Sequence, residues 1–296
     1  MRPRLPLDAR LTSTPFRVAD ARAAGVGEGR LRGADLERPF HGVRTARSTD
    51  SEHAYAPLLR DGERFSHVSA ARLWDVPIPL GLEDVHTTMV GGSRARSRGV
   101  VGHRASTGTA VIRAGLPASA PTTLFLELAN VLGLHDLVAA GDHLVHDPRI
   151  LDPRDPRPHL PLADLLAGAA RATGRGAPRA RAAAALVRAG AESPMETRLR
   201  LLARDAGLPE PVLQFELVGG RRRVGWFDLA WPERRLIAEY DGDQHRTSTR
   251  QYDRDIERFD AAYDLGWHVV RVRAPGLNAR SSDTRDRLRR AYQRSL

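Results

Sequence analysis

The sequence predicts a mixed α/β protein built from more than one domain. Its length of 296 residues exceeds the usual size of a single domain, and its hydrophobic content of 41% is sufficient for buried cores. The clearest pattern lies near the C-terminus, where a helix, two strands, a third strand, a long helix and a further strand follow in that order. We therefore expect a C-terminal α-β-β-β-α-β domain after a middle α/β domain and a small N-terminal helical module. The predicted boundaries are 1–48 for the N-terminal module, 49–166 for the middle domain, 167–190 for an Ala/Arg/Gly linker and helix, and 191–296 for the C-terminal domain.

Missing residue types exclude several kinds of chemistry. The chain has no cysteine, which excludes disulfides, thiolate zinc sites and cysteine nucleophiles, and is consistent with a reducing cytoplasm. It also has no lysine, so all 46 basic side chains are arginine, and a P-loop lysine or a Schiff-base lysine is excluded. No apolar run reaches about 18 residues, and the start lacks the apolar core of a signal peptide. We therefore expect a soluble, cytoplasmic protein with no membrane partner.

The charge of the chain favours an anionic partner. The formal net charge is +10, although solubility explains such a balance nearly as often as nucleic-acid binding does. Residues 1–48 hold 10 Arg against 5 acidic residues, and residues 193–296 hold 20 Arg against 16. We expect DNA as the partner, with RNA as an alternative, and these two segments as the places of contact.

The N-terminal segment has the outline of a winged helix. Thr14 and Pro15 can cap a short helix that ends at Gly25. A second short helix is expected at about 28–36, and residues 38–44 are typical of a small basic hairpin. Helix, turn, helix and hairpin in fewer than fifty residues is the order found in winged helices. The arginines expected to contact nucleic acid in this module are Arg30, Arg32 and Arg44.

The middle segment shows secondary structure but no catalytic pattern. His143 and His146 lie about one helical turn apart beside Asp142 and could ligate a metal, but no third ligand is evident, which favours a solvated helix face. The linker leads into a helix over 179–188. The other elements expected here are a helix over 66–74, strands over 84–90 and 99–103, and a helix over 122–137.

The C-terminal segment predicts its elements from apolar periodicity. Ser193 and Pro194 begin the first helix, and Gly207 ends it. Strands are expected over 213–218, 224–231, 235–240 and 267–273, with a turn at 219–220. The core face of the long helix between the last two strands is marked by Tyr252, Ile256, Phe259 and Tyr263.

Acidic residues in this segment have the spacing of a metal site. Asp228, Glu239, Asp241 and His245 follow the pattern D-x10-E-x-D-x3-H, and residues two apart on a strand share a face. If the two strands are antiparallel neighbours, Asp228 lies across from Glu239 and Asp241. Like charges so close repel by several kcal/mol at an intermediate dielectric, so the cluster requires a cation. Mg²⁺, or Mn²⁺ in its place, prefers such oxygen ligands.

These residues resemble the PD-(D/E)xK nuclease superfamily, and within it the branch of very-short-patch-repair endonucleases. The likeness covers about 193–277, with order and spacing intact. It departs from the superfamily pattern at Phe227, where proline would precede the aspartate, and at Asp241, where lysine would stand. The matching residues are Ser193 to Thr197, Asp228 to Pro232, Ala238 to Gly242, His245, Asp255 with Arg258, and Gly266 to Arg271.

The resemblance implies a restriction-endonuclease-like fold and Mg²⁺-dependent hydrolysis of a phosphodiester. Asp228 and Glu239 would hold Mg²⁺, and Glu196 or Asp241 would complete the shell. His245 would accept or donate the proton in place of the missing lysine. Phosphates would be bound by Arg246, Arg250 and Arg258.

Two of these residues have purely structural alternatives. Glu196 occupies the N3 position of a Ser-x-x-Glu capping box with Ser193, which requires no metal. Asp255 and Arg258 are spaced i, i+3 and can form an ordinary helix ion pair.

The N-terminal half is similar to the AbiEi-type antitoxins of bacterial abortive-infection systems, in which a winged helix precedes a larger α/β domain. The matching pieces are Pro15 to Arg17, Ala21 to Val26, Arg30 to Arg32, Gly42 with Val43, and Ser69 to Ala71. This likeness implies a second hypothesis, a regulator whose nuclease-like domain binds nucleic acid without cleaving it. A toxin-like RNase on the same fold is a third. The leading hypothesis is a DNA endonuclease of DNA repair, phage defence or mobile-element control, and a partner toxin or defence protein stays unspecified.

Overall fold

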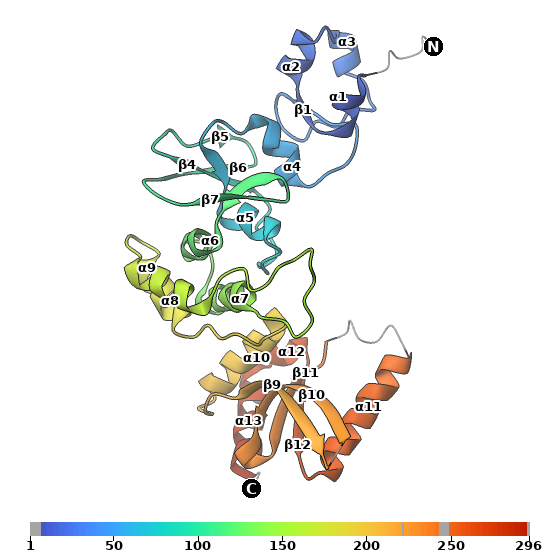
Figure 1. Cartoon of the computed structure of the whole chain (residues 1–296), viewed down its shortest axis with the longest axis vertical. Coiled ribbons are helices and arrows are strands. Elements are labelled where there is room, and N and C mark those ends of the chain that lie inside the picture. The colour runs from blue at the N-terminus through green and yellow to red at the C-terminus, as the bar shows by residue number, and fades with distance from the viewer. Residues whose placement is uncertain (1–6, 221, 243–248, 295–296) are drawn as a thin grey trace. The chain divides into compact units, whose positions relative to one another are not determined.

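The computed structural model describes residues 7–220, 222–242 and 249–294, and it shows a mixed α/β protein with several sheets (Figure 1). The chain divides into two compact units, Met1–Val131 and Leu132–Leu296. The domain boundaries expected after residues 48, 166 and 190 stay predictions. No helix in the described part of the chain is both long and apolar enough to cross a membrane.

The first unit begins with short helices around a two-stranded sheet. β1 (Phe16–Arg17) pairs antiparallel with β2 (Val43–Arg44). An isolated antiparallel bridge between Glu37 and Thr45 joins the two ends of the segment 38–44. The expected hairpin therefore forms at its base, but its second strand pairs with β1. The helices are α1 (Ala9–Ser13), α2 (Val18–Ala23) and α3 (Glu28–Leu31). The expected helix over 28–36 is wrong in length because it ends at Leu31, followed by Gly33, and glycine weakens a helix.

The rest of the first unit surrounds a six-stranded sheet of order β5-β6-β4-β3-β8-β7. The helix and strands expected over 66–74, 84–90 and 99–103 are confirmed as α5, β4 and β6. The helix expected over 122–137 is wrong, because the chain breaks between Leu128 and Leu134 into two helices. The elements are α4 (Ser51–Tyr55), η1 (Ala56–Leu58), β3 (Glu63–Phe65), α5 (His67–Leu73), β4 (Val85–Val90), β5 (Arg96–Ser97), β6 (Val100–Ala105), β7 (Ala110–Arg113), β8 (Leu116–Ser119) and α6 (Pro121–Leu128).

Three helices open the second unit: α7 (Leu134–Val145), α8 (Leu162–Arg171) and α9 (Ala177–Ala184). The helix expected over 179–188 is present as α9, shifted toward the N-terminus, and the end of α8 occupies part of the stretch expected to be a linker. α9 buries alanines at 177, 180, 183 and 184. Small side chains allow α9 to pack closely against its neighbours, which composition alone does not reveal. Asp142 is also not on a solvated face as expected, because it is 1% exposed.

The C-terminal elements follow the expected α-β-β-β-α-β order and end in two further helices. The sheet order is β12-β11-β10-β9, with β11 and β12 parallel and the other neighbours antiparallel. Gly207 ends the first helix as expected and has a φ of +83°, which a residue without Cβ adopts freely. The elements are α10 (Pro194–Asp205), β9 (Val212–Gly219), β10 (Arg222–Trp231), η2 (Pro232–Arg234), β11 (Leu236–Tyr240), α11 (Thr249–Asp264), β12 (His268–Val272), α12 (Ala274–Leu277) and α13 (Ser281–Arg294).

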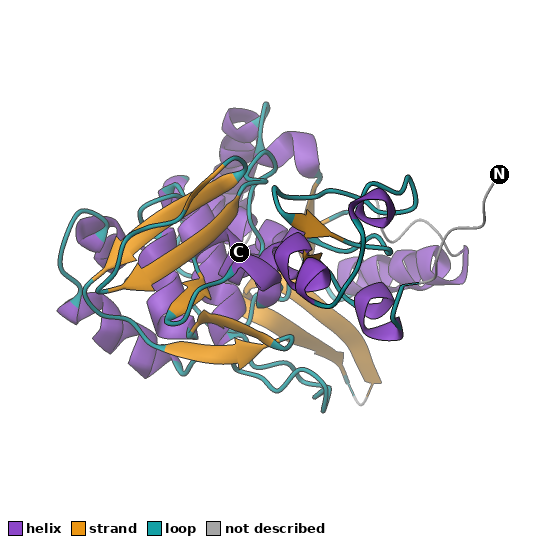
Figure 2. Ribbon diagram, turned by 90° about the horizontal axis from the view of Figure 1, so that it is seen from above, coloured by secondary structure: helices purple, strands orange, loops and turns teal. Residues whose placement is uncertain are grey.

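Apolar clusters lie against both faces of this sheet, and the ribbon view shows its strands together with the flanking helices (Figure 2). One cluster joins Leu199 of α10 and Leu288 of α13 to the strands, and the other joins Phe259 and Ala262 of α11. The core face expected for α11 is therefore partly wrong, because Ile256 is 40% exposed and Tyr263 is 48% exposed. The side chain of Tyr252 lies outside the described residues.

A buried ion pair ties α7 to α10. Asp142 accepts hydrogen bonds from Arg200 Nη2 at 2.8 Å, Thr197 Oγ1 at 2.8 Å and the backbone N–H of Arg188 at 2.8 Å. Arg200 and Asp142 are each 1% exposed. Burial raises the pKa of Asp142, and the positive charge of Arg200 opposes this shift.

Replacing Arg200 with alanine is expected to destabilise the second unit by about 3–5 kcal/mol, because it leaves Asp142 buried without its charged partner. Urea unfolding followed by tryptophan fluorescence measures this loss. Arg204→Ala on the same helix is the control, since Arg204 is half-exposed and lies 3.9 Å from the carboxylate of Asp205. Equal stability of the two variants would contradict the role given to the buried pair.

Candidate active site

Asp228 of β10 and Glu239 of β11 are brought together by the antiparallel pairing of their strands. The register places Leu229 opposite Ala238, so the next residues along each strand are Asp228 and Glu239. The Asp228 N–H donates to Glu239 Oε2 at 3.0 Å, and the Tyr240 N–H donates to Asp228 Oδ2 at 2.7 Å. Each carboxylate thus accepts a backbone N–H of the facing strand, which fixes both side chains at this end of the sheet.

Glu196 approaches the same place from the N-terminal turn of α10. Ser193 caps this helix by accepting the Glu196 N–H at 3.2 Å, as the capping-box alternative requires. The carboxylate of Glu196, however, accepts from Glu192 N–H at 2.8 Å and from Gln214 Nε2 at 3.0 Å through Oε2. Glu196 therefore has a structural role, and its charge also faces Asp228.

All three carboxyl groups have raised pKa values. Burial raises the pKa of Asp228 well above its usual value, and the negative charges of Glu239 and Glu196 raise it further. Burial likewise raises the pKa values of Glu239 and Glu196. A buried carboxyl group whose ionisation is opposed by two neighbouring carboxylates is a place where a bound cation is stabilised.

Arg258 supplies one positive charge at this place. Its Nη2 lies 2.6 Å from Glu239 Oε1 and 3.5 Å from Asp255 Oδ1, so the expected ion pair between Asp255 and Arg258 is confirmed. Its Nη1 also donates to the Trp226 carbonyl. Arg258 thus neutralises part of the carboxylate cluster from α11, which the sequence-based assignment to phosphate did not anticipate.

Asp241 lines the same pocket as Asp228 and Glu239, but it is paired with an arginine. β11 ends at Tyr240, and Asp241 Oδ2 accepts from Arg271 Nη2 at 2.9 Å. The described residues contain one group of three potential metal ligands whose ligand atoms all lie within 4.8 Å of one another, and it does not include Asp228, Glu239 or Asp241. Glu239 and Asp241 therefore lie on the same pocket, although Asp241 follows the last residue of β11.

The cluster opens into a pocket of about 960 Å³ within the second unit. Besides Asp228, Glu239 and Glu196, the pocket is lined by cationic side chains from several elements. Arg149 lies over the Trp226 ring at 4.2 Å and is 2.7 Å from Glu192 Oε1. The arginines that line it are Arg149, Arg198, Arg258 and Arg271.

The remaining proposed site residues of this segment are only partly described. His245 and Arg246 lie outside the described residues. Arg250 lies in α11, but its side chain is outside them.

The N-terminal arginines have protein partners. Arg30 pairs with Asp35 at 2.7 Å, and Arg32 is 3.9 Å from Glu28. Arg44 donates through Nε to the Leu31 carbonyl at 2.9 Å, and burial lowers its pKa. Arg44 therefore joins β2 to α3, which leaves Arg32, with 74% of its side chain exposed, as the most open of the three.

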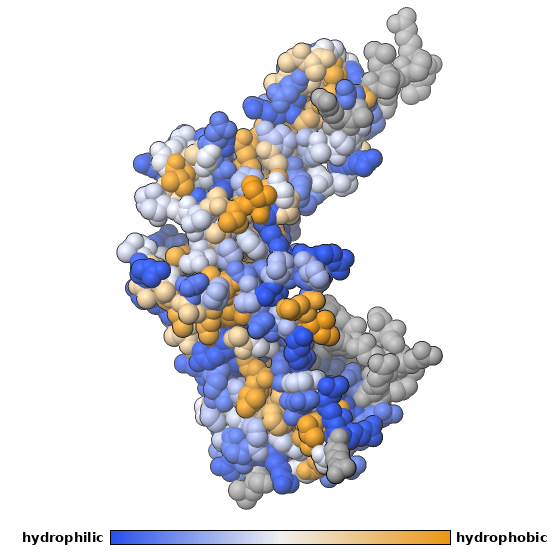
Figure 3. Space-filling view, in the orientation of Figure 1, coloured by the Kyte–Doolittle hydropathy of each residue, from blue (hydrophilic) through white to orange (hydrophobic). Residues whose placement is uncertain are grey.

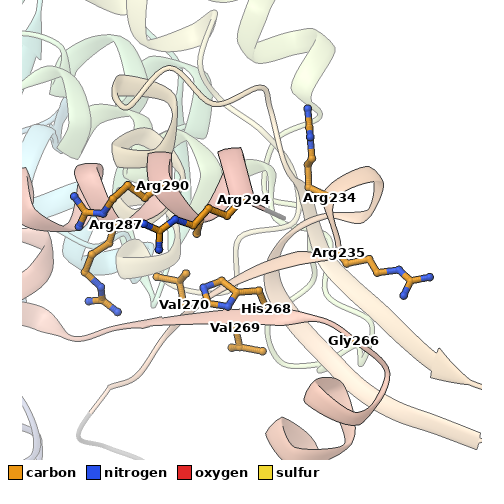
Figure 4. A pocket seen from close by; sticks show the side chains of 10 residues that line it. Arg234, Arg235, Gly266, His268, Val269, Val270, Arg287, Arg290 and Arg294 are labelled. Carbon is orange, nitrogen blue, oxygen red and sulfur yellow. The ribbon is translucent and has the colours of Figure 1, made fainter. Parts of the chain in front are cut away.

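A second cationic pocket, of about 590 Å³, lies at the opposite end of β11, beside the edge strand β12 (Figure 4). Arg287, Arg290 and Arg294 project from α13 beside His268 of β12 (Figure 4). No acidic side chain is among its described lining residues. Sequence reasoning missed this group, although the i, i+3 and i, i+4 spacing of arginines in α13 could have indicated a charged helix face. The lining arginines are Arg234, Arg235, Arg287, Arg290 and Arg294.

The face in Figure 3 shows mostly hydrophilic side chains, with apolar ones in small groups. Scattered exposed apolar side chains are normal for a protein surface and indicate no docking face.

No family model matches the chain. Two curated proteins of Mycobacterium tuberculosis are similar to part of it: uncharacterized protein MT2308 of strain CDC 1551 / Oshkosh and uncharacterized protein Rv2248 of strain ATCC 25618 / H37Rv. Each is 38% identical over 108 residues, which cover 34% of this chain and 40% of the relative. The chain thus matches less than half the length of these relatives, and neither name states an activity.

Asp228→Asn is expected to stabilise the second unit at neutral pH in the presence of a chelator. Folding raises the pKa of Asp228. The contribution of this carboxyl group to folding stability is therefore fully present below its usual pKa of about 3.9, and it is lost as the pH rises through the pKa of the folded state. Asparagine keeps an oxygen for the Tyr240 N–H but removes the charge. Each unit of pKa elevation corresponds to about 1.4 kcal/mol.

Thermal unfolding of wild type and variant between pH 4 and 8 measures the effect. The melting temperature of Asp228→Asn should exceed that of wild type at pH 7, and the difference should shrink toward pH 4. Asp260→Asn, at an exposed position of α11, is the control. A constant difference across this range would show that Asp228 is not a strained, buried charge.

Proposed function

We propose that the chain is a Mg²⁺-dependent endonuclease that hydrolyses DNA phosphodiesters, with a restriction-endonuclease-like C-terminal domain. The observation that carries the proposal is the meeting of Asp228, Glu239 and Glu196 in one pocket that arginines also line. Acidic and cationic groups in one pocket suit a site that binds both a metal ion and the phosphate that the ion activates.

The donor set fits a hard cation. Among the described residues, Asp228 Oδ1 has no hydrogen-bond partner, whereas the Glu196 carboxylate is held by Glu192, Ser193 and Gln214 and both oxygens of Glu239 are engaged. Carboxylate oxygens are the ligands that Mg²⁺ prefers. Asp228 would therefore offer the ion a free oxygen, and Glu196 and Glu239 would join it by exchanging one of their present hydrogen bonds. Asp241 lines the same pocket and would have to exchange its pair with Arg271 to do the same.

Bound Mg²⁺ supplies Lewis-acid activation of the scissile phosphate. Side chains of the protein would orient the ligands, bind the phosphate and transfer the proton. Arg258 orients Glu239 by its 2.6 Å contact and adds positive charge where the missing lysine would have acted. Arg149 and Arg271 are placed to bind phosphate oxygens, and His245 stays the proposed group for proton transfer.

Plasmid DNA, single-stranded DNA and RNA, each incubated with the purified chain and either Mg²⁺ or a chelator, test the proposal. We expect Mg²⁺-dependent cleavage of DNA. Asp228→Ala and Glu196→Gln should each lower the rate of DNA cleavage by more than about 100-fold. Loss of a metal ligand should reduce activity at least as much as loss of a residue that hydrogen-bonds to a metal ligand. Asp241→Asn, which breaks only the contact with Arg271, should have a much smaller effect. Full activity in Asp228→Ala would refute the assignment.

A regulator that binds nucleic acid without cleaving it is the second candidate. It is favoured by Asp241 at the lysine position and by the occupation of Glu239 by Arg258. Tight DNA binding with no cleavage in either Mg²⁺ or Mn²⁺ would support this function, and cleavage of RNA alone would support a toxin-like RNase.

The cationic pocket beside β12 is expected to contact the phosphate backbone. Arg290 and Arg294 have no ion-pair partner among the described residues, so both charges are available. Arg290→Ala with Arg294→Ala should weaken DNA binding and lower the slope of log K against log salt by about 2. Arg204→Ala is the control. An unchanged slope, measured by fluorescence anisotropy across a salt series, would remove this pocket from the interface.

A further inference from the structure

Three histidines gather on one face of the six-stranded sheet in the first unit. His86 lies on β4 and His103 on the parallel neighbour β6, where the register pairs Thr88 with His103. His67, the first residue of α5, packs on the same group. His67 and His86 are buried, with 6% and 8% of their surface exposed, and His103 is half-buried.

The imidazole nitrogens of these residues are close enough to share one ion. His103 Nε2 lies 3.1 Å from His86 Nδ1, a separation that suits either a hydrogen bond or two ligands of one metal. One ligand atom from each of the three rings lies within 4.8 Å of the others. The rings of His67 and His103 are stacked, with centroids 3.7 Å apart and planes at 15°, so one ring must turn about its side-chain torsions for all three to converge.

The backbone at His67 is held in an unusual conformation. Its φ of +47° is in the left-handed region, which costs a non-glycine residue about 1–3 kcal/mol. The surrounding structure fixes this conformation, since the His67 N–H donates to Glu127 Oε2 at 3.2 Å. Strain of this kind is concentrated at functional sites, and here it directs an imidazole into the cluster.

The histidines are in the form that binds metals. Burial lowers the pKa of His67 to about 2 and of His86 to about 4, and it also lowers the pKa of His103. Each ring is therefore neutral at pH 7 and offers one unprotonated nitrogen. Two nearby arginines are balanced by carboxylates, because Arg64 pairs with Glu127 at 2.9 Å and Arg72 with Glu52 at 3.1 Å.

A polar atom beside the cluster also lacks a partner. Thr88 is 1% exposed, and its Oγ1 has no hydrogen-bond partner in the described part of the chain. It lies in register with His103 and two residues from His86 on the same strand face. An unsatisfied hydroxyl at this position is consistent with a water or an ion in the cluster.

We propose that His67, His86 and His103 form a binding site for a borderline transition-metal ion, of which Zn²⁺ is the representative. Imidazole ligands favour Zn²⁺, Co²⁺, Ni²⁺ and Cu²⁺ over Mg²⁺. Three histidines leave a coordination position open to water. This site is separate from the carboxylate pocket in residues and in metal preference, and it does not depend on the proposed nuclease activity.

The full chain without a polyhistidine tag, stripped by a chelator and dialysed, is titrated with Co²⁺ and then with Zn²⁺. We expect one Co²⁺ per chain with the visible absorption of a nitrogen-ligated ion, displaced by Zn²⁺ but not by excess Mg²⁺. His67→Gln, His86→Gln and His103→Gln should each weaken Zn²⁺ binding by at least about tenfold. His41→Gln, an exposed histidine of the same unit, is the control and should bind normally.

The visible absorption spectrum of the Co²⁺-loaded wild-type chain tests the proposed site even if a variant fails to fold. Absence of the Co²⁺ absorption in folded wild type would overturn the proposal. So would equal loss of binding in His41→Gln, or unchanged affinity in all three cluster variants when circular dichroism shows them folded.

Discussion

The antiparallel pairing of β10 with β11 is the constraint on which the candidate active site depends. It places Asp228 opposite Glu239, and each carboxylate accepts a backbone N–H from the facing strand. A shift of β10 by one residue relative to β11 would turn Asp228 to the other face of the sheet, toward the apolar cluster around Leu229 and Ala238, and separate it from Glu239. The apolar residues that fix the register therefore also fix the acidic site.

The cost of this arrangement is electrostatic. Burial raises the pKa values of Asp228, Glu239 and Glu196, and the charges of Glu239 and Glu196 raise that of Asp228 further, so folding works against the ionisation of this cluster. Arg258 relieves the repulsion at Glu239. Asp228 has no such arginine among its hydrogen-bond partners in the described residues, which makes it the group whose charge a bound cation would stabilise most.

The sequence predicted the parts of the site that depend on local pattern. The D-x10-E spacing found Asp228 and Glu239, and the Ser-x-x-Glu pattern found the cap at Ser193. It did not reveal that Asp241 pairs with Arg271, because that contact joins residues thirty positions apart in the sequence. Arg258 was assigned to phosphate because a contact between α11 and β11 depends on packing that spacing does not encode.

The secondary-structure elements were likewise predicted where they depend on local pattern and missed where they depend on packing. Most strands of the C-terminal sheet were predicted within one or two residues, because buried strands form short apolar runs bounded by turns. The helix over 122–137 was predicted as one because its apolar pattern continues through the break, where Gly133 begins a second helix. The first part of the alanine-rich segment was taken for a linker before a helix over 179–188, because small side chains give a weak apolar signal even when they are buried.

The histidine cluster and the carboxylate cluster differ in how far the sequence alone can reveal them. Asp228 and Glu239 are eleven residues apart on consecutive strands, so a reader of the sequence can bring them together with one assumption about pairing. His67, His86 and His103 meet only because β4 and β6 are parallel neighbours and α5 packs across them. Parallel pairing requires a crossover whose partner strand the local pattern does not specify. Nitrogen ligands in one unit and oxygen ligands in the other suit different metals, so the two clusters can act in one chain without competing for the same ion.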